Sequence, residues 1–446
     1  MSKRVYIETY GCQMNVADTE LMLGVLGREG YEQTLAPEQA DVLLINTCAV
    51  RDNAEQRVLG RVGELQRHLE PGRVLGVVGC MAQRLGPRLL ERAAVDLVVG
   101  PDAYRNLPQL LGLAEAGERV TDTEFRRWEH YEDVPPVREP GPTAFVTVQR
   151  GCDFRCTFCI VPYTRGPERS RRLEDVVAEV RQLAEQGTSE VTLLGQTVNS
   201  YHDGTHDFAD LLRAVGAVDG VRRVRFTSPY PTEFTERVVE AMATTPEVCE
   251  HVHLPVQSGS NAVLKRMLRR YTRETYLEVV GRLRAAIPGV TISTDVIVGF
   301  PGETDEQFAE TLGLVPEADL DDAYMFRYSV REGTPAVKLA ARDEVPEEVA
   351  AERLDRLIGV MRGQTRRKNL ARVGQTHEVL VERPARRGRL LLARTRTNSL
   401  VLVDLPQSAI GSYHTVRLTG TTGSTFTGVL AAPCGAPSTS QLAVLG

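Results

Sequence analysis

Long apolar segments are absent from this 446-residue sequence, and no run approaches the roughly 18 residues that a membrane-spanning helix needs. The first residues, MSKRVYIETYGC, lack the long apolar core of a signal peptide. Internal repeats and low-complexity tracts are also missing. Hydrophobic residues make up 42% and charged residues 25% of the chain, which is typical of soluble globular proteins. We therefore expect a cytoplasmic enzyme of roughly three domains with no membrane partner.

A large net charge is also lacking, but the formal value of −6 hides an uneven distribution. Residues 361–446 contain 12 Lys and Arg against three acidic residues, a balance of +9, so the rest of the chain carries −15. A basic region of this size favours a polyanionic partner, although a single Arg-rich helix is more often only solvated.

The eight cysteines are the most informative residues. A cytosolic chain of this size does not need disulfides, so metal or redox chemistry is the better interpretation. Six of them form two sets of three: Cys12, Cys48 and Cys80 in the first hundred residues, and Cys152, Cys156 and Cys159 within one loop. Cys249 and Cys434 stand alone and are interpreted as packing or surface thiols.

Apolar runs alternate with helical patterns over most of the chain, which predicts an α/β protein. Residues 1–120 are expected to form a parallel α/β domain, residues 121–140 a linker, and residues 141–372 a partial (β/α)6 barrel. Short β-rich runs over residues 373–435 predict a small antiparallel β-barrel, followed by a frayed tail at 436–446. Cys12, Cys48 and Cys80 each follow a predicted strand, and the carboxyl ends of parallel strands are where ligands bind.

The segment RGCDFRCTFCIVPYTRG contains a Cys-x3-Cys-x2-Cys motif. Three thiolates in one loop can bind three corners of an iron–sulfur cubane and leave the fourth iron open for reaction. The alternatives are a zinc site, which would need a fourth nearby Cys or His, and a coincidental cluster. Arg165, at the end of this segment, could meet the cofactor or RNA, or equally pair with an acid. His251 and His253 alternate on a predicted strand and are interpreted as core or edge residues.

Cys152, Cys156 and Cys159, with Phe158 before the last cysteine, resemble the signature of radical S-adenosylmethionine (SAM) enzymes. The resemblance implies a four-iron four-sulfur cluster whose open iron binds SAM, and a 5′-deoxyadenosyl radical released by one electron. It places Phe158 near the adenine. Later segments resemble the cofactor-contacting loops of these enzymes, through Gly195, Gln196, Asn199, Gln257, Ser258, Ser293 and Asp295.

The resemblance extends over about 430 residues to the methylthiotransferase family, through YGCQMNVADTE, INTCAVRDNAEQ, VVGCMAQR, YSVREGTPA and ARTRTNSLV. It implies a second four-iron cluster on Cys12, Cys48 and Cys80 as the sulfur source, and an RNA-binding, TRAM-like terminal barrel. The most similar branch acts on tRNA and converts N6-isopentenyladenosine next to the anticodon into its 2-methylthio derivative, with SAM as methyl donor and radical source. Four residues depart from the family pattern, and none is a cluster ligand: Pro167, Thr197, Val330 and Glu332.

The implied partners are a tRNA anticodon stem-loop, a reducing protein of the flavodoxin or ferredoxin type, and an iron–sulfur carrier. Base recognition in single-stranded RNA uses stacking and arginine contacts, and the candidates in the barrel are Arg387, Arg394, Arg396 and Asn398. Two related alternatives are methylthiolation of threonylcarbamoyladenosine in tRNA and of an aspartate in a ribosomal small-subunit protein. An alternative of another class is a non-catalytic iron–sulfur RNA-binding sensor.

Overall fold

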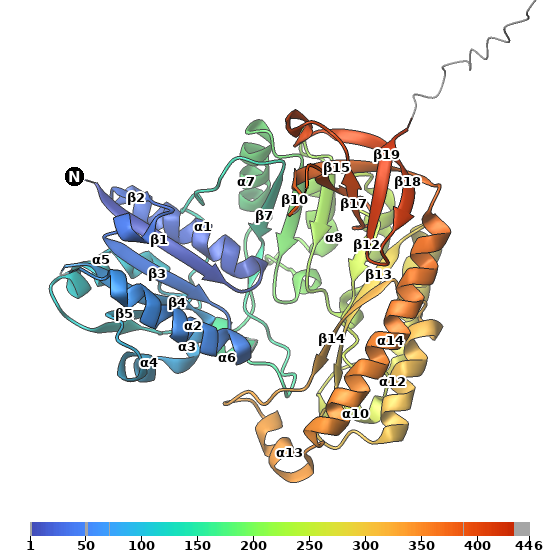
Figure 1. Ribbon diagram of the computed structural model, residues 1–446, viewed down its shortest axis with the longest axis horizontal. Coiled ribbons are helices and arrows are strands. Elements are labelled where there is room, and N and C mark those ends of the chain that lie inside the picture. Colours follow the sequence, from blue (N-terminus) through green and yellow to red (C-terminus); the bar gives the residue numbers. More distant parts are fainter. Residues whose placement is uncertain (1, 50–51, 71, 387, 432–446) are drawn as a thin grey trace, which may run out of the picture. The chain divides into compact units, whose positions relative to one another are not determined.

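The computed structural model describes residues 2–49, 52–70, 72–386 and 388–431, and its elements are labelled in Figure 1. The chain divides into two compact units, Met1–Val360 and Met361–Gly446, and each is described by itself. Over the described ranges, no helix has the length and apolar character needed to cross a membrane. The expected tail at 436–446 and Cys434 lie outside the described residues.

The amino-terminal part is a six-stranded sheet in the order β2-β1-β3-β4-β5-β6, with every neighbouring pair parallel. This confirms the expected parallel α/β fold. Its strands are β1 (Lys3–Tyr10), β2 (Tyr31–Gln33), β3 (Val42–Thr47), β4 (Val74–Gly79), β5 (Leu97–Val99) and β6 (Val120–Asp122). Its helices are α1 (Gln13–Arg28), α2 (Asp52–Leu65), α3 (Cys80–Leu85), α4 (Pro87–Arg92) and α5 (Leu107–Glu115).

Helices cover both faces of this sheet. One buried core joins the sheet to α1 and α5, and a second joins it to α2, α3 and α4 (Figure 1). Every residue of β3 and β4 is buried, which explains the apolar runs VLLI and VLGVV with which these strands begin. The sheet therefore fixes where the carboxyl ends of its central strands lie.

The segment expected as a linker contributes to the first core. Strand β6 pairs with β5 and includes the first two residues of the expected linker, Thr121 and Asp122. Tyr131 and Val134 are buried in the core with α1 and α5, and the Tyr131 hydroxyl donates a hydrogen bond of 2.9 Å to the Pro101 carbonyl. This segment is thus packed against the amino-terminal sheet.

A second α/β array follows within the same unit. Six parallel strands form two three-stranded sheets, β11-β10-β7 and β12-β13-β14, and a single bridge between Val224 and Val248 lies where they approach. The strands are β7 (Thr143–Thr147), β10 (Glu190–Leu194), β11 (Arg223–Phe226), β12 (His251–His253), β13 (Thr291–Val298) and β14 (Asp322–Arg327). Helices between them are α6 (Val161–Arg165), α7 (Leu173–Glu185), α8 (Phe208–Gly216), α9 (Glu236–Thr244), α10 (Asn261–Arg266), α11 (Arg273–Ala286) and α12 (Asp305–Glu317). The expected partial barrel is confirmed.

Short strands β8 (Gln149–Arg150) and β9 (Arg169–Ser170) pair with each other and flank the cysteine-rich loop. Helix α13 (Ala336–Asp343) follows the last strand of the array, and α14 (Glu347–Arg372) runs across the division between the two units.

The second unit contains a closed five-stranded barrel in the order β15-β16-β17-β19-β18, as expected. Its strands are β15 (Thr376–Pro384), β16 (Leu391–Thr395), β17 (Leu400–Val403), β18 (Tyr413–Thr421) and β19 (Thr425–Leu430). Alternate side chains point inward, and Val379, Val381, Val401 and Phe426 are fully buried in its core. Closure leaves this small sheet without an exposed edge.

Candidate metal centres

The first cysteine set lies at the carboxyl edge of the amino-terminal sheet. Strands β1, β3 and β4 are neighbours, and the register pairs their last residues with one another. Cys48 and Cys80 directly follow β3 and β4, and Cys12 comes two residues after β1. The Cys48 amide donates a hydrogen bond of 2.9 Å to the Tyr10 carbonyl, which holds two of these chain segments together. The sheet thus brings three cysteines distant in sequence to one edge.

Glycines allow these loops to approach closely. Gly79 adopts a φ of +94°, which favours glycine, and a Cβ there would lie 2.7 Å from the Thr47 carbonyl oxygen. A Cβ on Gly11 would lie 2.2 Å from Oδ1 of Asn15 and 3.0 Å from Cβ of Cys48. The side-chain nitrogen Nδ2 of Asn15 also donates to the Thr47 carbonyl at 3.2 Å. Cys12 and Cys48 are therefore supported by tightly packed backbone.

The second set lies in the loop after β8. The Cys152 amide donates to the Gly166 carbonyl at 3.1 Å, and the Cys159 amide donates to the Cys156 carbonyl at 3.0 Å. Gly151 has a φ of +79°, and a Cβ on it would lie 1.9 Å from the Pro167 carbonyl oxygen. This loop is compact and closed against the segment that follows it.

The thiols lie in surroundings that change their acidity. Burial raises the pKa of Cys159 to about 12, and burial also raises the pKa values of Cys80 and Cys152. A hydrogen bond with Cys48, together with the charge of Arg165, lowers the pKa of Cys12 to about 6. Burial favours the protonated thiols. Because iron binds thiolates, coordination to a cluster would deprotonate these cysteines.

These donor sets fit cubane clusters better than single ions. In the part of the chain that the structure describes, no three His, Cys, Asp or Glu side chains are placed to hold one metal ion. Each thiolate of a cubane binds a different iron, so its ligands are spread more widely than those of one ion. Three cysteines in each set leave the fourth iron of a four-iron cluster available.

The two cysteine sets are neighbours in space. Ile160, which directly follows Cys159, packs with Cys80 and Ala49 in one buried apolar cluster. Ala49 in turn directly follows Cys48. The segment that carries the second set therefore packs directly against residues of the first set, so groups bound by the two sets would be close.

Each cysteine set receives a hydrogen bond from an arginine. Arg269 donates from Nη1 to Cys156 Sγ at 3.3 Å, and its guanidinium stacks on the rings of Tyr230 and Tyr271 at 4.3 and 4.9 Å. Arg165 donates from Nε to Cys80 Sγ at 3.1 Å. Sequence reasoning missed Arg269, and left open whether Arg165 meets a cofactor or an acid.

Thr197 contacts the second set as well. Its hydroxyl lies 3.3 Å from Cys152 Sγ, and its amide donates to Oε1 of Gln149 at 3.1 Å. Thr197 departs from the residue that the family pattern leads us to expect, and this departure is the signal that could have directed attention to it.

The loop after β10 supports the second set. Gln196 accepts a hydrogen bond of 2.6 Å from the Gly151 amide, and a Cβ on Gly195 would lie 2.7 Å from Gln149 Oε1. Both polar atoms of the Asn199 side chain bond to the backbone of Tyr230, at 2.9 and 2.7 Å. These three candidate cofactor residues thus position the loop and its neighbours.

Candidates on later strands lie in buried polar or aromatic surroundings. Gln257 is buried with a φ of +71°, and Ser258 is fully buried beside the Thr311 hydroxyl at 3.2 Å. Phe158 contacts Phe300 edge to face, with ring centroids 6.5 Å apart. A left-handed backbone at a non-glycine residue such as Gln257 often marks a functional site.

Ser293 and Asp295 belong to a polar cluster with two histidines. The Ser293 hydroxyl lies 3.1 Å from Nε2 of His251 and 3.0 Å from Nδ1 of His253. Nε2 of His253 lies 3.3 Å from a carboxylate oxygen of Asp295. The histidines that the sequence favoured as core or edge residues thus contact two candidate cofactor residues, which strand alternation alone did not show.

In the barrel unit, the Arg394 guanidinium forms an ion pair with Glu382 and donates to Asn398 Oδ1 at 2.9 Å. Asn398 has a φ of +65°, so this turn is fixed by both its backbone and its side chain. Arg396, two residues after Arg394, is half-buried. Arg387 lies outside the described residues.

Two family models match the chain. Residues 146–315 match the radical SAM superfamily, and residues 4–100 match an uncharacterized protein family, UPF0004. The first match covers the second cysteine set, and the second match covers the first set.

Similar proteins extend over nearly the whole chain. A tRNA-2-methylthio-N6-dimethylallyladenosine synthase from Porphyromonas gingivalis is 44% identical over 438 residues, which are 96% of this chain and 94% of that protein. A protein of the same name from Geobacillus thermodenitrificans is 47% identical over 440 residues, 96% of this chain and 84% of that one.

Solved structures with the same fold are much less similar in sequence. The radical SAM methyltransferase TsrM from Kitasatospora setae, with cobalamin and a [4Fe-4S] cluster bound, gives a TM-score of 0.59 at 15% identity. The match covers 78% of this chain and 80% of that one. At this identity, the similarity describes the fold alone.

Proposed function

The chain belongs to the family of tRNA-2-methylthio-N6-dimethylallyladenosine synthases, radical SAM enzymes that modify tRNA, and from this premise we propose how its residues divide the work. Enzymes of this family use SAM and two four-iron clusters. We assign the radical-generating cluster to Cys152, Cys156 and Cys159. We assign the sulfur-donating cluster to Cys12, Cys48 and Cys80.

One observation carries this assignment: Ile160, which directly follows Cys159, packs with Cys80 and with Ala49, which directly follows Cys48. The unactivated C2–H bond of adenine cannot be broken by a side-chain base at neutral pH, and the clusters with SAM supply the radical and the methylated sulfur. The chain's own residues then have to hold both clusters near one adenine. The contact of Ile160 with Cys80 and Ala49 supports such a common site.

The substrate adenosine is proposed to lie in an anticodon stem-loop and to carry an isopentenyl group. Gln257 and Ser258 follow β12 in the chain, as the second set follows β8, which supports a role in binding SAM. Ser293 and Asp295 lie within β13, and the Asp295 carbonyl accepts a hydrogen bond of 2.8 Å from the Gln257 amide, so we propose them for the same site. Phe158 is proposed to contact its adenine. We propose that a flavodoxin- or ferredoxin-type protein donates the electron and that an iron–sulfur carrier supplies the clusters. The reaction is proposed to take place in the cytoplasm, where tRNA is processed.

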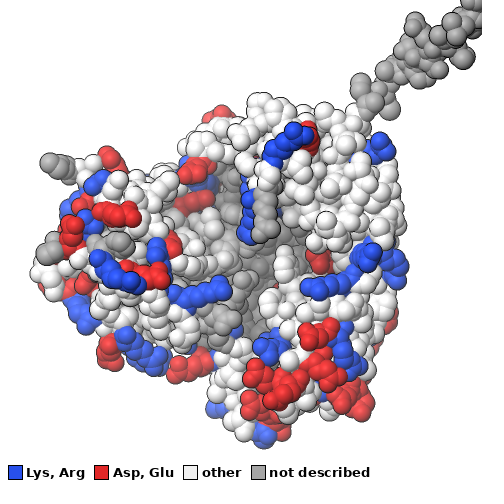
Figure 2. Space-filling model, in the orientation of Figure 1, with Lys and Arg blue, Asp and Glu red and all other residues white. Residues whose placement is uncertain are grey.

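Electrostatics favour the carboxyl-terminal region as the tRNA-binding part, because residues 361–446 carry +9. The first unit contains a contrasting surface. Figure 2 shows acidic side chains gathered where α13 and the start of α14 lie, and Asp343, Glu344, Glu347 and Glu348 are exposed. Phosphates would be repelled there. We propose that Arg394, Arg396, Asn398 and Arg387 belong to the RNA-binding barrel.

The two cluster assignments are tested by separate triple variants. Replacing Cys152, Cys156 and Cys159 by Ala should leave about half the iron of the reconstituted protein and abolish 5′-deoxyadenosine formation. Replacing Cys12, Cys48 and Cys80 by Ala should also leave about half the iron, keep SAM cleavage and abolish thiolation. The matched control is Cys249→Ala, which should retain full iron and activity. Full iron and thiolation in the amino-terminal triple variant would refute the second cluster site.

A further inference from the structure

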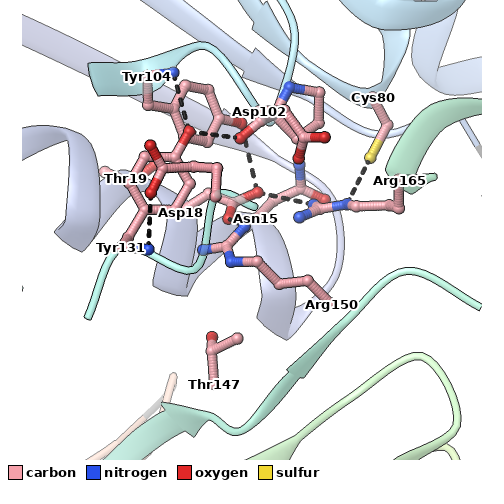
Figure 3. Close-up of polar contacts among 12 residues, drawn as sticks. Asn15, Asp18, Thr19, Cys80, Asp102, Tyr104, Tyr131, Thr147, Arg150 and Arg165 are labelled. Atoms are coloured by element: carbon pink, nitrogen blue, oxygen red, sulfur yellow. Dashed lines mark hydrogen bonds and ion pairs between the residues drawn. The ribbon is translucent and has the colours of Figure 1, made fainter. Parts of the chain in front are cut away.

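A buried carboxylate connects the two cysteine loops. Asp18, on α1, has no solvent exposure, and its two oxygens face two arginines: Oδ1 lies 3.0 Å from Nη1 of Arg150, and Oδ2 lies 2.7 Å from Nη2 of Arg165. The Tyr104 hydroxyl donates to the same carboxylate at 3.3 Å. Figure 3 shows Asp18 between the two guanidinium groups, with Cys80 beyond Arg165.

The position of these residues in the chain is informative. Asp18 comes six residues after Cys12, and Arg150 comes two residues before Cys152. Arg165 ends α6, the helix that begins after Cys159. One carboxylate thus holds residues next to both cysteine sets, and a shift of either loop would break a buried ion pair.

Arg165 also contacts the first set directly. Its Nε donates to Cys80 Sγ at 3.1 Å, and its Nη1 is buried without a hydrogen-bond partner among the described residues. The side chain is only 3% exposed, so bulk solvent does not reach that donor. A buried unpaired N–H group is costly unless a ligand accepts from it. An inorganic sulfide of a cluster next to Cys80 would be such an acceptor.

The balance of buried charges also favours a negatively charged ligand next to Arg165. Within the described part of the chain, Asp18 is the only carboxylate that forms an ion pair with Arg150 or Arg165, so two buried cations share one anion. An uncompensated buried charge is strongly unfavourable. A four-iron core bound by three thiolates carries net negative charge and would balance the excess.

We propose that Arg165 sets the reduction potential of the cluster held by Cys12, Cys48 and Cys80, and that Asp18 is the positioning residue that fixes it. This inference rests on the cluster assignment proposed above. A hydrogen bond to a ligand sulfur and a nearby positive charge both stabilise the reduced, more negative cluster, so Arg165 raises its potential. Asp18 partly offsets that charge and keeps the guanidinium aimed at Cys80.

The test uses the full chain with Cys152, Cys156 and Cys159 replaced by Ala, so that the remaining cluster is observed alone. Its midpoint potential is measured by titration with dithionite, followed by electron paramagnetic resonance. Arg165→Gln should lower the potential, because the charge is lost. Asp18→Asn should raise it, because the charge is less compensated. A tenfold change in the ratio of reduced to oxidised cluster at fixed potential corresponds to about 59 mV for one electron.

Shifts of opposite sign in the midpoint potentials of Arg165→Gln and Asp18→Asn indicate an electrostatic role. Loosened packing would shift the potentials of both variants in the same direction. Arg165→Lys, which keeps the charge, should lie between wild type and Arg165→Gln. The matched control is Arg169→Lys. Arg169 forms a buried pair with Asp102 at 2.7 Å, again between the two α/β parts of the first unit, and makes no hydrogen bond to any cysteine that the structure describes. The midpoint potential of the Arg169→Lys variant should equal that of the parent, which carries only the replacements of Cys152, Cys156 and Cys159.

Three results would overturn the inference. Unchanged potentials in Arg165→Gln and Asp18→Asn, or shifts of the same sign in both, would remove Arg165 from control of the cluster while leaving the proposed function intact. If the parent triple variant binds no iron, the cluster assignment itself fails, and the inference fails with it. The iron content of the parent therefore distinguishes the two failures.

Discussion

Glu168 is half-buried beside the loop of the second cysteine set, where burial raises its pKa to about 7. Its amide donates to Asp153, and its carboxylate accepts from the Ser200 hydroxyl at 2.8 Å. In the unfolded chain the same carboxyl ionises near pH 4.5. The folded state therefore holds a proton that the unfolded state has lost between these values, and stability falls as the pH rises through this window.

We predict that Glu168→Gln, which cannot ionise, gains stability relative to wild type as the pH rises from 5 to 8. Thermal unfolding temperatures at both pH values check this. Glu332→Gln is the control, because a hydrogen bond with Arg88 lowers the pKa of this exposed carboxyl, and no such gain is expected. An equal difference between Glu168→Gln and wild type at pH 5 and pH 8 would contradict the proposed protonation.

At the residue scale, sequence reasoning found the cysteines but not their surroundings. The cysteines stand in a local motif or at strand ends, which periodicity can locate. Arg269 meets Cys156 across 113 positions of the chain, and Arg165 meets Cys80 across 85. Such contacts arise from tertiary packing and leave no local pattern. Asn199 was predicted as a cofactor contact, and its side chain bonds to the Tyr230 backbone, a partner that no local pattern indicates.

At the scale of elements, the loop between β8 and α6 depends on a glycine. We predict that Gly151→Ala disrupts this loop, because the backbone would be strained and the new Cβ would clash with the Pro167 carbonyl. The reconstituted variant should lose about half its iron and its SAM cleavage. Iron analysis and a 5′-deoxyadenosine assay measure both.

Gly281→Ala is the matched control for this change. Gly281 lies within α11, where a Cβ would meet nothing within 4 Å. Alanine favours a helix interior over glycine by about 0.5–1 kcal/mol, so this variant should be as stable as wild type or more stable. Full iron content in Gly151→Ala would show that the loop tolerates the change, contrary to our account.

Elements with strong periodicity were predictable, and short polar ones were not. The buried strands β3 and β4 begin with the apolar runs VLLI and VLGVV, so a parallel sheet covered on both faces followed from the sequence. Strand β6 has the sequence VTD and was placed at the boundary of a linker. Pairing with β5 determines its conformation, which three residues of ordinary propensity cannot reveal.

At the scale of the whole molecule, the charge balance predicts where tRNA affinity comes from. We expect that a chain ending at Arg372, which lacks the barrel, binds tRNA more weakly and with a flatter salt dependence. Each lost phosphate contact removes about 0.7–0.9 units from the log–log slope of affinity against salt. Filter binding over a salt series measures the slope. SAM cleavage without tRNA should persist, and an unchanged slope in this folded variant would exclude the barrel from RNA binding.

Substrate choice tests the central claim most directly. The anaerobically reconstituted enzyme, with reductant and SAM, is compared on anticodon stem-loops that carry isopentenyladenosine, threonylcarbamoyladenosine or plain adenosine, with the ribosomal protein as a fourth substrate. Burial of a five-carbon group contributes about 25 cal/mol per Å², enough for roughly a hundredfold preference over plain adenosine. The account predicts that mass spectrometry detects the fastest methylthiolation on the isopentenyl stem-loop. Faster reaction of the threonylcarbamoyl stem-loop, modification of the ribosomal protein alone, or tRNA binding without SAM consumption would contradict it.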